Sequence, residues 1–149
     1  YLDKENNRAA DQGYPTPIQP TKAATDGDYN EALKLSIENI DVVEICAGTH
    51  NEESAMYLTE LMASNNLPNN HLNVYFSQLY GMSDYMSFNL AASGYNVSKY
   101  LPYGPVRATL PYLIRRAKEN SAIAGQMSKE YSMISDELKR RKNQSFEVE

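Results

Sequence analysis

The feature that most constrains the fold is residues 99–120, KYLPYGPVRATLPYLIRRAKEN, where a strand end, a proline-rich turn and a helix follow one another without a linker. At about 100° per residue, the apolar side chains of this helix gather on one face. They are Val106, Leu110, Leu113, Ile114 and Ala117. The opposite face carries Tyr112, Arg115 and Glu119, with Arg116 beside it. We therefore predict a helix that packs on one side and presents two guanidinium groups on the other.

The arginine pair has two interpretations. Most exposed arginines are solvated charges, and that is the simpler reading. Against it, Arg115 precedes Glu119, which is the less favourable order for an i,i+4 ion pair. Tyr100 and Tyr103 lie just before the turn, where a strand of an α/β fold would end. Guanidinium groups suit bidentate binding of a carboxylate or phosphate, so we predict an anion-binding helix face.

Helical and strand patterns alternate along the chain. The predicted helices are residues 3–12, 25–39, 52–65, 83–92, 105–120 and 128–141, with Pro111 kinking the fifth or splitting off a first segment. The predicted strands are residues 41–51, 73–79 and 96–103. Such alternation is typical of parallel strands joined by right-handed crossovers. A (β/α)8 barrel needs about 250 residues, so these 149 residues predict part of one.

Composition excludes several classes of protein. Hydrophobic content of 42% and charged content of 22% are typical of a globular chain, and no apolar run is long enough to span a membrane. The net charge is −5, and the one basic cluster is residues 139–142, so we do not expect nucleic-acid binding. Cys46 is the single cysteine, which excludes an internal disulfide; its apolar neighbours predict a buried thiol. Because the chain opens on Tyr1 rather than Met, we expect a fragment of a longer protein.

Candidate functional residues follow from the rule that parallel barrels place them at the carboxyl ends of strands. Thr49, His50 and Asn51 end the first predicted strand, and Gln78, Leu79 and Tyr80 end the second. His50 alone is weak evidence, because a histidine at a strand end is more often structural. His71 lies in a polar turn without the partner spacing of a zinc site, so no metal site is predicted. No G-x-S-x-G nucleophile motif or dinucleotide-binding motif is present either.

The motif YxPYGPVxxxLPYLxRRAxEN resembles the last strand and last helix of the proline dehydrogenase family. GTHNEES is similar to the family's strand-six motif, FSQLYGMSD to its strand-seven motif, and Tyr1-Leu2-Asp3 to the end of its strand five. The segment GYPTPIQPTKAATDGDYN resembles the eukaryotic-like branch. The resemblance implies that residues 1–142 are the C-terminal portion of the FAD-binding barrel, from the end of strand five through helix eight. Residues 143–149 would be a flexible tail.

The same resemblance implies a flavoenzyme that oxidises L-proline to Δ1-pyrroline-5-carboxylate and passes electrons through FAD to a quinone. The implied substrate-binding residues are Arg115 and Arg116, which would clamp the carboxylate, and Tyr100, Leu79 and Tyr1, which would line the pocket for the proline ring. The implied cofactor-binding residues are Thr49, His50, Asn51 and Glu119. The family's catalytic lysine and acidic residue would lie upstream, so no catalytic residue is predicted here.

Further expectations concern context and alternatives. The implied partner is the upstream half of the same barrel, without which the fragment is expected to be inactive. The resemblance is compatible with peripheral membrane association of the full-length protein. It implies the bacterial cytoplasm or inner-membrane face, or the mitochondrial matrix or inner membrane in a eukaryote. Two other classes stay open: a non-redox barrel lyase or aldolase that binds a carboxylate or phosphate through the arginine pair, and a non-catalytic fragment.

Overall fold

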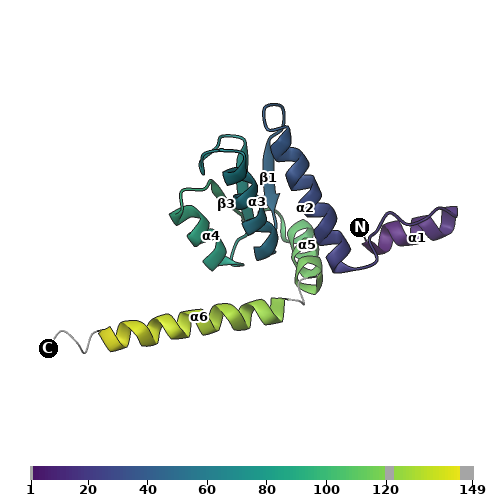
Figure 1. The fold of residues 1–149 in the computed structure, drawn as a ribbon. Helices are drawn as coiled ribbons and strands as arrows, with labels where there is room; N and C mark the ends of the chain where they lie inside the picture. The colour runs from purple at the N-terminus through teal and green to yellow at the C-terminus, as the bar shows by residue number, and fades with distance from the viewer. Residues whose placement is uncertain (1, 120–122, 145–149) are drawn as a thin grey trace. The chain divides into compact units, whose positions relative to one another are not determined.

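The computed structural model describes residues 2–119 and 123–144 (Figure 1). It divides into two compact units, residues 1–75 and 76–149, which are described separately. In the described residues the strands form one sheet with the order β1-β2-β3, and helices alternate with them along the chain. The α/β class with a parallel sheet is therefore confirmed.

The first unit contains α1 (Leu2–Gln12), α2 (Lys22–Glu38), β1 (Ile45–Gly48) and α3 (Glu52–Ser64). α2 begins several residues earlier than predicted, because the Thr21 hydroxyl accepts a hydrogen bond from the Ala24 amide and caps the helix there. α2 and α3 pack against each other. Their buried apolar side chains form the core of this unit: Leu33, Ile37, Ala55, Leu58 and Met62.

Two further predictions in the first unit are wrong. The first strand runs only from Ile45 to Gly48 instead of over residues 41–51, and the Val42 side chain is 85% exposed although its β propensity is high. Cys46 is exposed rather than buried, because side chains alternate along a strand and those of Ile45 and Ala47 take the buried face. Apolar neighbours in sequence therefore do not indicate burial at a strand position.

The second unit contains most of β2 (Val74–Leu79), followed by α4 (Asp84–Ala92), β3 (Val97–Tyr100), α5 (Val106–Glu119) and α6 (Ile123–Gln144). β2 and β3 are parallel, with Phe76 opposite Val97 and Leu79 opposite Tyr100. The Phe76 ring is fully buried and meets the Tyr95 ring edge-on, with 5.4 Å between the centroids. The register of β2 and β3 therefore places the carboxyl ends of the two strands next to each other.

Several predicted boundaries in the second unit are also wrong. β3 ends at Tyr100, not at residue 103, and Gly125 lies inside α6 instead of preceding it. α6 reaches Gln144, so residues 143–144 of the predicted tail are helical, and residues 145–149 lie outside the described residues. α5 runs continuously across Pro111, without a separate first segment. Among the described residues, no helix is both long and apolar enough to cross a bilayer.

Candidate functional site

Two of the predicted pocket residues come together at the carboxyl ends of β2 and β3. Leu79 and Tyr100 are opposite each other in the parallel register, and the Tyr80 amide donates a hydrogen bond to the Tyr100 carbonyl at 2.9 Å. Residues paired in this way project from the same face of a sheet. Leu79 is half-buried, and Tyr100 is 53% exposed. An aliphatic and an aromatic side chain thus form one wall at the strand ends.

Tyr112 of α5 extends this wall toward the arginine pair. Its ring meets that of Tyr100 edge-on, with centroids 6.0 Å apart and planes at 87°. The guanidinium carbon of Arg116 lies 5.5 Å from the centroid of the Tyr112 ring, within the range of a cation–π interaction. The Nε atom of Arg116 is buried. Tyr112 therefore lies between the strand-end tyrosine and a guanidinium group.

The structure corrects the predicted orientation of this helix. The less exposed positions of α5 include Thr109, Tyr112 and Arg116, not the apolar residues. Val106 is 75% exposed, and the other apolar positions whose side chains are described are also exposed: Leu110, Leu113 and Ile114. The hydrophobic face was predicted to pack, but in the described part of the chain the helix turns its tyrosine–arginine side toward β3.

The two arginines differ in their surroundings. Arg116 is half-buried and stacks on Tyr112, whereas Arg115 is exposed. The sequence predicted the same carboxylate-binding role for both arginines, and Tyr112 was not assigned to the pocket. The available signal was spacing, because Tyr112 is three residues before Arg115 and four before Arg116, on the same side of a helix.

The remaining predicted residues at a strand end form a local turn in the first unit. The Asn51 amide donates to the Thr49 hydroxyl at 3.0 Å, and the Asn51 side-chain oxygen accepts from the Glu53 amide at 3.1 Å. Asn51 is therefore the N-cap of α3. Thr49 and His50 are half-buried at the end of β1. The Asn51 side chain holds the first turn of α3, and Thr49 and His50 lie beside it at the carboxyl end of the strand.

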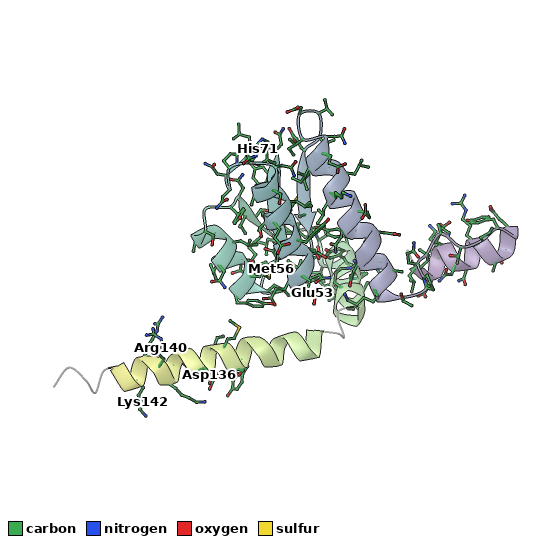
Figure 2. All side chains as sticks on the ribbon, in the orientation of Figure 1. Glu53, Met56, His71, Asp136, Arg140 and Lys142 are labelled. Atoms are coloured by element: carbon green, nitrogen blue, oxygen red, sulfur yellow. The ribbon has the colours of Figure 1, made fainter. Side chains whose placement is uncertain are left out.

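His71 lies far along the chain from this turn, in the loop that precedes β2. Figure 2 shows it beyond the other end of α3 from Glu53 and Met56. Its ring Nδ1 accepts a hydrogen bond from the Asn73 amide at 3.3 Å. Among the residues that the structure describes, no three His, Cys, Asp or Glu side chains are grouped so that they could hold a metal ion.

A family model described as proline dehydrogenase matches residues 1–129 of the chain. The chain belongs to the proline dehydrogenase family. Mitochondrial proline dehydrogenase 1 of Homo sapiens is 41% identical over 145 residues, which cover 95% of this chain and 24% of the human protein. A hydroxyproline dehydrogenase of Xenopus laevis is 39% identical, with 95% of this chain and 31% of that protein covered.

A solved structure agrees with these proline dehydrogenase relatives. Proline utilization A from Bdellovibrio bacteriovorus, inactivated by N-propargylglycine, superposes with a TM-score of 0.72 at 29% identity, over 80% of this chain and 12% of that one. The chain spans between about a quarter and a third of the length of the curated relatives quoted above. The predicted family is therefore confirmed over residues 1–129, a longer stretch than the motifs that suggested it.

Two of the residues implied by the proline dehydrogenase family cannot be placed fully. Glu119 is the last residue of α5, and its side chain lies outside the described part. Tyr1 lies outside the described residues altogether. The structure therefore assembles three members of the predicted substrate pocket in one unit, namely Leu79, Tyr100 and Arg116, and adds Tyr112 to them.

Proposed function

We propose that the chain is the C-terminal portion, residues 1–142, of a (β/α)8 barrel that binds FAD and oxidises L-proline to Δ1-pyrroline-5-carboxylate. It would run from the end of strand five through helix eight. The observation that carries the proposal is the convergence of Leu79, Tyr100, Tyr112 and Arg116 within one unit. An apolar and aromatic wall beside a guanidinium group suits a small ring that carries a carboxylate.

In this proposal the protein's main task is to position the substrate. Arg116, with Arg115 beside it, binds the carboxylate through charge-assisted hydrogen bonds and so sets the orientation of the ring. Leu79, Tyr100 and Tyr112 contact the carbon atoms of the ring, and Tyr1 completes the wall. Holding a reacting carbon in one orientation is worth several kcal/mol of the activation barrier, about 7–11 kcal/mol in well-oriented model reactions.

The cofactor-binding residues in this proposal are Thr49, His50, Asn51 and Glu119. Thr49 and His50 fit the polar part of a flavin, because both are half-buried hydrogen-bonding groups at the carboxyl end of a strand. The adjacent first turn of α3 holds Glu52 and Glu53, which disfavour a phosphate at that helix end. We therefore assign Thr49 and His50 to the uncharged portion of FAD. When bound, the flavin supplies the hydride acceptor and passes electrons on to a quinone.

The exposed apolar face of α5 supports the barrel proposal. Val106, Leu110, Leu113 and Ile114 form a stripe that a free helix in water would not favour. The upstream portion of the same barrel is the partner that we propose for it. The relatives named mitochondrial support the mitochondrial matrix or inner membrane over a bacterial compartment, with peripheral membrane association of the full-length protein.

The test uses the full-length protein that contains these residues. We expect a purified protein with the visible absorption of a flavin, which bleaches when L-proline is added without oxygen and recovers when a quinone is added. D-proline is the control, because a carboxylate clamp beside a fixed ring wall discriminates the two enantiomers. A colourless protein, or a flavin that L-proline does not reduce, would refute the proposal. Hydroxy-L-proline is tested in parallel, since a named hydroxyproline dehydrogenase is nearly as similar as the proline dehydrogenases.

A further inference from the structure

Lys99 immediately precedes the pocket residue Tyr100, but its side chain lies on the other face of the sheet. Alternation along β3 sends the two side chains to opposite faces of the sheet. The Lys99 ammonium donates a hydrogen bond to the Met82 carbonyl at 2.6 Å and lies 2.7 Å from Oδ1 of Asp84. Its side chain is only 23% exposed. Lys99 therefore ties the end of β3 to the segment that follows β2.

That segment, residues 80–83, has an unusual backbone. Gly81 and Ser83 both have a left-handed conformation, with φ of 76° and 51°. Such a conformation is unfavourable for a residue other than glycine, and Ser83 is also buried. A strained backbone persists only where its surroundings hold it. Residues 80–83 directly follow Leu79, so their position bears on the pocket wall.

Ser87 of α4 holds this segment from the side of the sheet that faces α4. The Ser87 amide donates to the Ser83 carbonyl at 3.1 Å, and the Ser87 hydroxyl, which has one proton to donate, lies 3.1 Å from the same carbonyl and 2.8 Å from Oε1 of the buried Gln78. Gln78 and Lys99 are opposite each other in the strand register. The side chains behind Leu79 and Tyr100 are thus the ones that connect the strand ends to α4 and its preceding loop.

The location of the Lys99 charge also needs a specific reason. An ammonium group near the first turn of a helix opposes the helix dipole, which favours anions there. Asp84 is in the first turn of α4, and the Met82 carbonyl is just before it. Both partners offset that cost.

We propose that Lys99 is a positioning residue for the substrate pocket. By bridging Met82 and Asp84, it sets the distance between the ends of β2 and β3, and with it the gap between Leu79 and Tyr100. The effect on substrate binding rests on the proposed function. The link from Lys99 to Met82 and Asp84, which we call the tether, does not depend on that function. The positioning role predicts that loss of Lys99 loosens residues 80–83 and weakens binding of the substrate more than it slows the chemical step.

The experiment compares Lys99→Met with the wild type in the full-length holoenzyme. We expect KM for L-proline to rise about tenfold with kcat within about twofold, because a misplaced pocket wall weakens binding of the ring. Flavin content per mole of folded protein should not change. In parallel, hydrogen–deuterium exchange of the backbone amides of residues 80–87 should become faster. Lys99→Arg keeps the charge and should recover most of both effects.

The matched control is Lys22→Met. Lys22 also pairs with an aspartate, Asp26, but it is 74% exposed and lies on α2 in the first unit. We expect KM and exchange in residues 80–87 to match the wild type. If Lys99→Met does not yield folded protein, Asp84→Asn tests the same tether. For this variant we expect a smaller rise in KM and faster exchange in residues 80–87. Unchanged KM and unchanged exchange in the variant that folds would overturn the positioning role. A wild type that does not oxidise proline would refute the proposed function, while the exchange measurement still tests the tether.

Discussion

Replacing the two arginines of α5 one at a time separates substrate binding from a solvated helix surface. In the proposed site both guanidinium groups bind the substrate carboxylate. A hydrogen bond to a charged group contributes roughly 1.5–3 kcal/mol net, and about 1.4 kcal/mol corresponds to tenfold in affinity. Arg115→Met and Arg116→Met should therefore each weaken proline binding by roughly ten- to a hundredfold.

The structure makes the two variants unequal in a second respect. Arg116 is half-buried and stacks on Tyr112, and a cation–π contact of this kind adds about 0.5–2 kcal/mol. Arg116→Met should therefore also lower the thermal midpoint and disturb the tyrosine that the guanidinium covers. Arg115 is exposed, so Arg115→Met should leave the thermal midpoint close to that of the wild type. Lysine at position 115 or 116 should rescue binding only in part, because it keeps the charge and loses the planar fork.

The assay is steady-state oxidation of L-proline by the full-length holoenzyme, with the dissociation constant of a competitive carboxylate ligand measured by flavin absorbance. Arg107→Met is the matched control, because Arg107 is an exposed arginine on the same helix. It should change the affinity by less than about 0.5 kcal/mol. If all three variants bound L-proline like the wild type, the arginines would be surface charges, and the main argument for a carboxylate site on α5 would fail.

Four further predictions concern the cofactor, the cap of α3, the exposed face of α5 and the isolated chain. His50→Ala should lower FAD occupancy after purification more than it changes proline affinity in the remaining holoenzyme; unchanged flavin content would contradict the assignment. Asn51→Ala removes the cap of α3 and should lower the free energy of unfolding by about 1 kcal/mol, whereas Asn51→Ser should keep most of it. Ile114→Gln, on the exposed face of α5, should destabilise the full-length protein if the upstream barrel buries that face; an unchanged thermal midpoint would argue against that partner. Residues 1–149 produced alone should be poorly soluble and should not retain FAD, because sheet edges stay unpaired; a soluble yellow monomer would refute this.

Sequence reasoning predicted the order and type of the elements because those depend on local periodicity. It was less successful at element ends. Val42 has high β propensity, yet β1 begins only at Ile45. Gly125 was expected to precede the last helix, but the cost of one glycine in a helix is only about 1 kcal/mol and the rest of α6 outweighs it. α2 begins at Lys22 rather than at residue 25, because Thr21 caps it there.

In the candidate site, too, features that depend on local sequence could be predicted, and contacts between different elements could not. Leu79 and Tyr100 could be predicted because each ends a strand, and parallel strands bring such residues together. The contact of Tyr112 with Tyr100 could not, because the two residues are on different elements, although helical spacing already placed Tyr112 on the side of the arginines. Cys46 illustrates the converse, since the strand face that it occupies depends on which neighbours pack against β1.

The two arginines of the proposed site differ in how firmly their positions are fixed. Arg116 is held by Tyr112, which itself contacts Tyr100, so the position of this guanidinium is tied to the end of β3. Arg115 is exposed in the described part and has greater freedom to adjust. A rigid and an adaptable cation on one helix can bind a carboxylate without requiring both to be preorganised. Lys99 acts on the same strand end from the opposite face, through Met82 and Asp84. On this reasoning, Lys99→Met should affect Arg116 and Tyr100 together, and combining it with Arg116→Met should cost less than the sum of the two separate losses.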